Sequence, residues 1–366
     1  MQLPSRGQLA AAGAVVAMAV GVAACSSSSS SSSAPSGSGS PGAGSSGGSA
    51  SGTINGAGST FQTNFQQTAI SEFKSTNPNI TVNYQSVGSG SGRADLYKNS
   101  VLFAGSDSPI PSVEQSQVPA GKTVLYFPVQ IGPIAIAYNL SGVKNLKLDA
   151  PTLAKIFQGE IKTWNDPAIK ALNPGVSLPG TTITTAVRSD SSGTTQNFSQ
   201  YLVNAAGSDW KLGTSSTIKW PSTARAGDGG SGLAQIVKST PGAIGYVDFS
   251  TATASGLSAA TIKNSSGAYV APSSKAATEA ASHVTPKADL TFLTVDQPGA
   301  GSYPITYQSW DLVYAKQPNA NDAALLKAYL GYLLGQGQSL LTSLNLAPLP
   351  PSIDNMAKAQ LSKITS

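Results

Sequence analysis

The spacing of hydrophobic residues switches repeatedly along the chain between every second residue, as in a strand, and every third or fourth residue, as in a helix. Predicted strands and helices therefore alternate. Residues 80–84 alternate as a half-buried strand does, and residues 182–187 are rich in β-branched side chains. Phe65, Ala69 and Phe73 recur four residues apart, as expected of one face of a helix. Strands that alternate with helices predict an α/β fold with a mostly parallel sheet.

Four of the predicted strands run into short loops of glycine and hydroxyl residues. These loops contain Ser59-Thr60, Ser89, Ser106-Asp107 and Ser192-Gly193-Thr194. Ligands of such sheets bind beyond the carboxyl ends of the strands. Together with one arginine and one aspartate, the four loops predict a site for a small polar anion.

The loop at residues 186–195 carries the clearest signal. A strand precedes it, and Phe198, Tyr201 and Leu202 follow at helical spacing, so the loop opens a helix. Backbone N–H groups at the positive end of a helix favour an anion, and the planar guanidinium of Arg188 suits a tetrahedral oxyanion. The other interpretation is an ordinary Ser or Asp helix cap beside a solvated arginine.

The N-terminal 52 residues predict export and anchoring rather than a folded domain. Arg6 precedes an apolar stretch at residues 9–22, and the run up to Cys25 resembles the lipobox of bacterial lipoproteins. We expect a signal peptide over residues 1–24 and a lipidated Cys25, which would attach the protein to the membrane; a chance cysteine behind an ordinary signal peptide is the alternative. Residues 26–52 are uncharged Ser, Gly, Ala and Pro, which predicts a flexible tether.

Composition narrows the class of protein. A chain of 366 residues predicts two or more domains. The formal charge of +5 comes without a block of Lys or Arg, so a nucleic-acid surface is not indicated. Cys25 is the single cysteine, so the folded part has no disulfide and depends on its core.

The sequence lacks recognisable catalytic machinery. From residue 53 onward the nucleophile-elbow pattern G-x-S-x-G does not occur, and residues 116–123 lack the first glycine of a phosphate-binding P-loop. The single histidine, His283, has no acidic or cysteine neighbour, and we expect it on the surface, although a Ser–His triad stays possible in principle. We therefore expect a binding protein with no catalytic residue, no metal and no organic cofactor.

Several stretches of the globular part together resemble the PstS family, the phosphate-binding lipoproteins that serve bacterial phosphate ABC transporters. They occur in family order at residues 56–61, 83–89, 105–109, 161–164, 188–194, 217–221 and 241–247. The resemblance implies a two-lobed periplasmic-binding-protein fold, in which each lobe is a mostly parallel sheet flanked by helices and two crossover strands join the lobes. Residues 53–128 plus 304–366 would form lobe I, and residues 129–303 lobe II.

The resemblance also implies a ligand set and partners. The phosphate ligands carried over by motif are Thr60, Phe61, Ser89, Asp107, Arg188, Ser192, Gly193 and Thr194. The implied partners are inorganic phosphate and the permease subunits of an ABC importer, with a monomeric binding subunit anchored on the outer face of the cell membrane through Cys25. Gln62 and the pair Ala104-Gly105 depart from the usual family pattern without altering these ligands.

Asp107 suits phosphate rather than sulfate. An ionised carboxylate accepts hydrogen bonds and cannot donate them, and phosphate near neutral pH keeps an O–H group whereas sulfate has none. A buried Asp107 would therefore attract the first anion and repel the second. Arsenate keeps a proton as well, so an arsenate, sulfate or molybdate protein of the same fold, and a phosphate sensor or adhesin without a transport role, stay open as alternatives.

Overall fold

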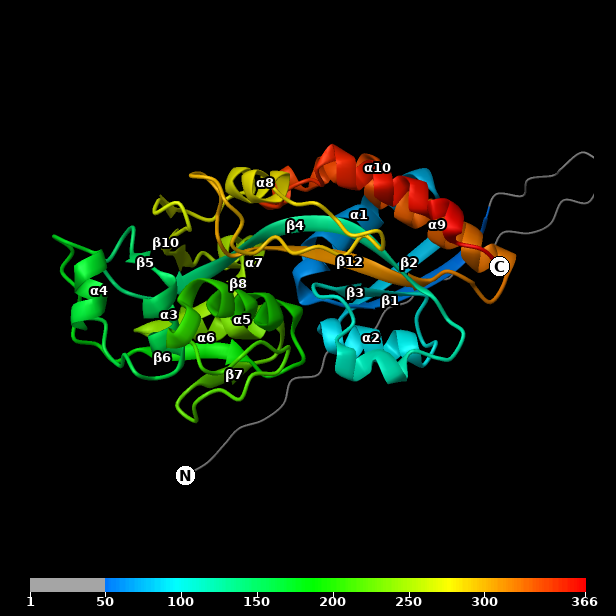
Figure 1. Ribbon diagram of the computed structural model, residues 1–366. Coiled ribbons are helices and arrows are strands. Elements are labelled where there is room, and N and C mark those ends of the chain that lie inside the picture. The colour runs from blue at the N-terminus through cyan, green and yellow to red at the C-terminus, as the bar shows by residue number, and fades with distance from the viewer. Residues whose placement is uncertain (1–49) are drawn as a thin grey trace, which may run out of the picture. The chain divides into compact units, whose positions relative to one another are not determined.

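Two long buried strands cross the centre of the structure. In this computed structural model, which describes residues 50–366, β4 (Val124–Tyr138) and β12 (Thr306–Tyr314) pair antiparallel from Thr306↔Pro133 to Tyr314↔Val124 (Figure 1). Almost every residue of both strands is buried: β4 is mostly apolar, whereas β12 also buries polar residues, among them Gln308, Ser309 and Asp311. The register between them slips by one residue at Val129, next to Pro128, which has no N–H to give to the ladder.

Parallel strands extend the sheet on both sides of this central pair. One half adds β1 (Gly52–Gly58), β2 (Ile80–Ser86) and β3 (Phe103–Ser106), and the other adds β6 (Thr184–Arg188), β7 (Arg225–Gly227) and β8 (Ala243–Asp248). The strand order is β2-β1-β3-β12-β4-β8-β6-β7, with β9 (Ser258–Ala259) on β4. β4 pairs with β12 as far as Pro133 and with β8 from Ile134 onward, so it passes from one half to the other.

Helices flank both halves of the sheet (Figure 1). The first half carries α1 (Thr63–Thr76), α2 (Ser89–Tyr97), α9 (Ala320–Leu334) and α10 (Pro351–Gln360). The second carries α3 (Ala150–Phe157), α4 (Pro167–Leu172), α5 (Gly193–Ala206), α6 (Gly229–Ser239) and α7 (Phe249–Ala254), and α8 (Ser274–Ser282) packs on β4 and β12. A small sheet contains β5 (Lys147–Leu148), β10 (Thr261–Lys263) and β11 (Tyr269–Val270).

The α/β prediction with two lobes and two crossover strands is confirmed. The outer strands of each half are parallel, as predicted, whereas both crossover strands pair antiparallel with their neighbours. Within residues 50–366, no helix has the length and apolar character that spanning a bilayer demands. The predicted signal peptide, Cys25 and nearly all of the tether lie outside the described residues.

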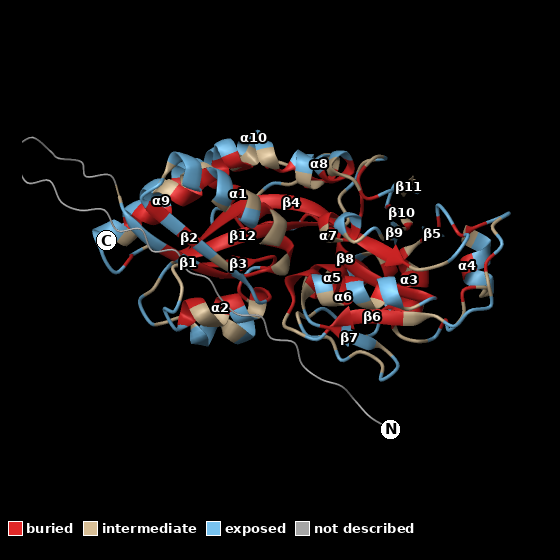
Figure 2. Cartoon of the chain, turned by 180° about the vertical axis from the view of Figure 1, so that it is seen from behind, coloured by how far each residue is buried: buried red, intermediate tan, exposed pale blue. Residues whose placement is uncertain are grey.

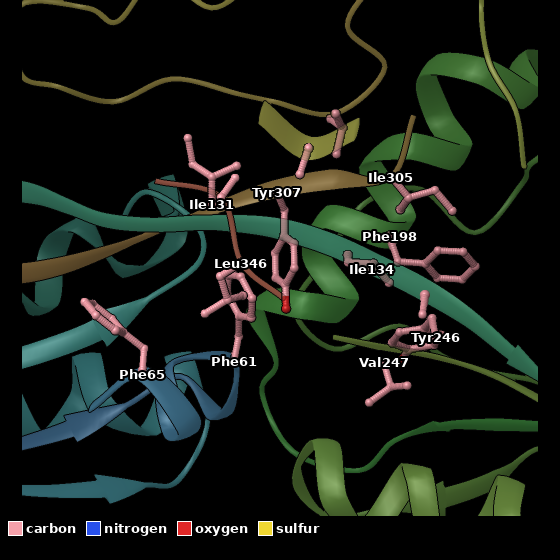
Figure 3. Close-up of a cluster of buried hydrophobic side chains, with 14 of the residues drawn as sticks. Phe61, Phe65, Ile131, Ile134, Phe198, Tyr246, Val247, Ile305, Tyr307 and Leu346 are labelled. Carbon is pink, nitrogen blue, oxygen red and sulfur yellow. The ribbon is translucent and has the colours of Figure 1, made fainter. Parts of the chain in front are cut away.

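One continuous hydrophobic core runs through both halves (Figures 2 and 3). Phe61 stacks on Tyr307 with ring centroids 4.0 Å apart, and Phe198 stacks on Tyr246 at 4.5 Å. Ile134 of β4 lies between these two pairs in Figure 3, and Ile131 of the same strand lies on the other side of Tyr307. Burying a large apolar side chain contributes about 1.5–3 kcal/mol, so this core holds the fold together in a chain with no second cysteine.

Two stretches differ from the sequence-based expectation. The strand expected at residues 101–104 is β3 at Phe103–Ser106, because its pairing with β1 carries it two residues further. Residues 250–288 show little pattern yet contain α7, α8 and β9–β11. The buried face of α8 consists of alanines alone, which give a weak hydrophobic signal. His283 is exposed at the end of this helix, as expected.

Candidate functional site

The polar loops of the two halves meet where their strands end. Gly193, the first residue of α5, lies against the opposite half: a Cβ atom there would come within 2.5 Å of Ser89 Oγ and 2.6 Å of Asp107 Cβ. Asn197 of α5 donates a hydrogen bond to the Asp107 carbonyl (2.7 Å). The loops after β2, β3 and β6 therefore converge, as their sequences predicted.

The loop after β1 joins the same contact region. Thr60 opens a short 3-10 helix (Thr60–Gln62), and its Oγ1 accepts a hydrogen bond from the Gly230 backbone N–H of α6 (3.3 Å). The side chain of Asp248 lies beside this contact, because a Cβ atom on Gly230 would be 3.2 Å from Asp248 Oδ2 and 3.6 Å from Thr60 Oγ1. Thr60 thus contacts the second half of the protein from the same half that carries Ser89 and Asp107.

The Asp107 carboxylate is buried and hydrogen-bonded from its own half. Ser309 Oγ donates to Oδ1 (2.6 Å), and Ser89 Oγ lies 3.4 Å from Oδ2. Burial raises the pKa of Asp107 to about 6, and the hydrogen bonds of Ser309 and Ser59 and the charge of Arg188 limit that rise. At neutral pH the group is therefore largely an ionised acceptor held in a fixed position.

Arg188 is buried and paired, so the interpretation of a solvated arginine is wrong. Its Nε and Nη2 donate to the two Asp190 carboxylate oxygens at 2.7 and 2.5 Å. Asp190 Oδ1 also accepts the Gly229 N–H at the start of α6 (3.1 Å), which ties the ion pair to a second helix. Asp190 thus orients the guanidinium, leaving Arg188 with further N–H donors for a ligand.

The remaining predicted residues have distinct local roles. Ser192 caps α5 by accepting the Thr195 N–H (3.1 Å), as the helix-cap interpretation expected, and both it and Thr194 are buried. The Phe61 N–H donates to Ser59 Oγ (3.1 Å), so this predicted donor is engaged within the chain. Contacts across the boundary are thus made by Thr60, Gly193, Ser89 and Asp107, whereas the Phe61 N–H and Ser192 are engaged within their own segments.

Sequence reasoning missed an acidic residue, Asp248, at the same boundary. It is the last residue of β8, caps α7 by accepting the Thr251 N–H (2.8 Å) and is buried. Burial raises its pKa to about 6; its hydrogen bonds to Thr251 and the charge of Arg188 oppose this, and the Asp107 charge adds to it. An acid at the end of a buried strand is the same signal that pointed to Asp107, so this residue could have been found.

A buried ion pair between Arg93 and Glu114 holds the loop that carries Asp107. Arg93 of α2 is fully buried and forms a bidentate pair with Glu114 (2.8 and 2.7 Å). Its Nη1 donates to Ser106 Oγ (2.9 Å), the residue before Asp107. The hydrogen bond of Arg93 lowers the pKa of Glu114 against the opposing effect of burial, so the pair is charged and fixes the loop.

The boundary combines one fixed cation, Arg188, several hydroxyl and N–H donors, and two buried carboxylates, Asp107 and Asp248. Within residues 50–366, no three His, Cys, Asp or Glu side chains group as a metal site would need. Such a set of donors around a poised carboxylate acceptor suits a small oxyanion that carries a proton. Two α/β lobes joined by two crossover strands, with this site between them, define a two-lobed solute-binding protein.

Comparison with known proteins gives the family. The family model described as "PBP superfamily domain" matches residues 43–336. The chain is 38% identical over 311 residues to Phosphate-binding protein PstS 3 of Mycobacterium leprae, covering 82% of this chain and 84% of that protein. It is 34% identical over 316 residues to Phosphate-binding protein PstS of Haemophilus influenzae, covering 84% and 92%. The chain belongs to the PBP superfamily and, within it, to the PstS family.

Solved structures agree on the fold. A high affinity periplasmic phosphate-binding protein, solved at subatomic resolution with phosphate bound, superposes with a TM-score of 0.71 at 22% identity, covering 84% of this chain and 94% of that chain. The phosphate-binding protein of Stenotrophomonas maltophilia gives a TM-score of 0.68 at 20% identity, covering 84% and 93%.

Proposed function

We propose that this protein binds inorganic phosphate between its two lobes, outside the cell membrane, and delivers it to an ABC importer. The observation that carries the proposal is the buried Asp107 carboxylate, held by Ser309 and facing α5 of the opposite lobe. A carboxylate acceptor among many donors matches an oxyanion that has kept a proton. The names of the relatives support phosphate as that anion.

The proposed ligands are the eight residues that the sequence predicted. Thr60, Phe61, Ser89 and Asp107 would bind from one lobe, and Arg188, Ser192, Gly193 and Thr194 from the other. Arg188 supplies charge and directional N–H donors, and the N-terminus of α5 adds backbone donors at the positive end of its dipole. Since the ligands come from both lobes, phosphate binds the closed arrangement more tightly than an open one and thereby favours closure.

We also propose the lobe boundaries and the anchor. Residues 53–128 plus 304–366 form lobe I, residues 129–303 form lobe II, and residues 25–52 join them to lipid on Cys25 after removal of a signal peptide. The protein then acts as a monomeric, membrane-anchored binding subunit that binds phosphate without turnover. Arsenate is the second candidate ligand, because it also offers a proton to Asp107.

Calorimetric titration of the purified protein, stripped of bound phosphate, tests the function. The proposal expects saturable binding of one phosphate per chain and no release of product. A folded sample that binds neither phosphate nor arsenate would contradict it. Labelling with a radioactive fatty acid in a bacterial host, with Cys25→Ser as the control, tests the anchor: the label should be lost in the variant.

A further inference from the structure

The hydroxyl group of Tyr307 is buried without a partner. Tyr307 lies in β12 with no exposed surface, and within residues 50–366 no group meets its oxygen in hydrogen-bonding geometry. A hydroxyl that has left water without gaining a partner costs about 1–3 kcal/mol. Buried polar groups in native proteins are nearly always satisfied, so an orphan of this kind points to a partner that the chain itself does not supply.

The surroundings of this hydroxyl are those of the proposed binding site. Burial raises the pKa of Tyr307 well above its usual value, and the charges of Asp248 and Asp107 raise it further; the nearby Thr194 hydroxyl, which does not meet hydrogen-bond geometry, and the charge of Arg188 oppose them. Three of these four neighbours are proposed phosphate ligands, drawn from both lobes. The phenol therefore keeps its proton at neutral pH and offers one O–H donor to the space that they share.

Packing fixes the direction of this donor. The Tyr307 ring stacks on Phe61 with centroids 4.0 Å apart and an interplanar angle of 23°. Figure 3 shows the side chain leaving β12 beside Phe61, with the hydroxyl oxygen at its far end. Tyr307 pairs with Gly132 of β4, where a Cβ atom would come within 3.0 Å of the Phe61 ring, so a side chain at residue 132 would disturb the stack.

We propose that the Tyr307 hydroxyl is a further ligand of the bound oxyanion, to which it donates one hydrogen bond from the crossover strand. The inference rests on the proposed function and extends its ligand set to the strand that joins the lobes. A phenol O–H serves any oxyanion, protonated or not, whereas Asp107 distinguishes them. Tyr307 therefore contributes to affinity, and Asp107 to selectivity.

The experiment compares two Tyr→Phe variants by calorimetric titration with phosphate and with arsenate. Tyr307→Phe removes the hydroxyl and keeps the stacked ring. Tyr201→Phe is the matched control, because the Tyr201 hydroxyl of α5 is also buried without a partner in the described chain but has Tyr303, Asp296 and Asp149 as its charged or polar neighbours. None of these three is a proposed ligand.

The inference expects Y307F to bind phosphate and arsenate about tenfold more weakly, by the same factor for both, as befits one hydrogen bond to a charged group. Its thermal unfolding temperature without ligand should equal or exceed that of the wild type, because an unsatisfied buried group is gone. Y201F should keep wild-type affinity. A Tyr307→Leu variant, which also lacks the hydroxyl, should show the same loss of phosphate and arsenate affinity. It replaces Y307F in the test if Y307F does not fold.

Phosphate affinity in Y307F within twofold of the wild type would overturn the inference, and so would an equal loss in Y201F. If the wild type binds phosphate and Y307F binds it equally well, the proposed function is supported but Tyr307 is not a ligand. Failure of the wild type to bind either anion would overturn the function and this inference together.

Discussion

Ser309 donates a 2.6 Å hydrogen bond to the Asp107 carboxylate, and so links the crossover strand β12 to the loop after β3. Gln62 Nε2 in turn donates to Ser309 Oγ (2.8 Å), and Gln66 Nε2 donates to Gln62 Oε1 (2.9 Å). Asp107 is thus the end of a buried polar chain in lobe I. Its orientation and ionisation depend on residues far from it in sequence.

Ser309→Ala should raise the pKa of Asp107 above its value of about 6, because the hydrogen bond from Ser309 favours the ionised form. A protonated Asp107 no longer repels sulfate, so sulfate binding in the wild type should strengthen as the pH falls through about 6. In S309A the same strengthening should begin at higher pH. Sulfate titrations between pH 5 and 8 measure the midpoint, with Ser282→Ala on the exposed end of α8 as control, and coincident midpoints would contradict the assignment.

Arg188→Ala should weaken phosphate binding tenfold or more. A hydrogen bond to a charged group contributes about 1.5–3 kcal/mol, and the variant also leaves the half-buried Asp190 carboxylate without its cation, with only the Gly229 N–H as partner. Arg225→Ala is the control, because Arg225 lies exposed on the neighbouring strand β7. Equal phosphate affinity in R188A and R225A, measured by calorimetry, would show that Arg188 does not contact the ligand.

Gly193→Ala should prevent the two lobes from closing on the ligand without disturbing the fold of either lobe. The new Cβ atom would overlap Ser89 Oγ and Asp107 Cβ of the opposite lobe, whereas alanine suits the helix that Gly193 begins. Phosphate affinity should fall at least tenfold and the unfolding temperature should change little. Gly331→Ala in α9, where a Cβ atom would meet Leu361 at 3.8 Å, should leave both quantities unchanged. Tight phosphate binding by G193A would argue against the closed contact.

Asp311→Asn should flatten the pH dependence of stability. Asp311 is fully buried beside Gln66 Nε2, and burial raises its pKa from 3.8 to about 7. Between these values the folded state keeps a proton that the unfolded state releases, so the free energy of unfolding falls as the pH rises toward 7. D311N lacks that decline.

Urea unfolding of the ligand-free protein at pH 6 and pH 8 measures the difference. Asp107 and Asp248 also titrate near pH 6, but they do so in both proteins, so the difference between the wild type and D311N isolates Asp311. Wild type and D311N with the same change in stability between the two pH values would refute this explanation.

The sequence predicted the parts of the site that follow from local pattern. Asp107 and Arg188 each stand at the end of a predicted strand, and glycine and hydroxyl residues mark the loops beside them. The α/β class followed from the alternation of strand-like and helix-like spacing of hydrophobic residues. These features need only the geometry of one strand, one loop and one helix.

The remaining parts depend on long-range pairing. Ser309 reaches Asp107 because β12 pairs with β3, Trp310 opposite Ser106, across 200 residues of intervening chain. Nothing local to Ser309 or Tyr307 distinguishes them from other residues of a buried strand. Both crossover strands run antiparallel to their neighbours because the chain passes from one lobe to the other and then returns. This path depends on the whole chain and cannot be predicted from any single segment.

The most direct test of the account is the ratio of phosphate to sulfate affinity in the wild type and in Asp107→Asn, measured by calorimetric competition at pH 8, above the Asp107 pKa of about 6. The account predicts strong preference for phosphate in the wild type and a much smaller preference in D107N, because the amide can donate to an oxygen that has no proton. An unchanged ratio in D107N would contradict the claim that this carboxylate selects the anion.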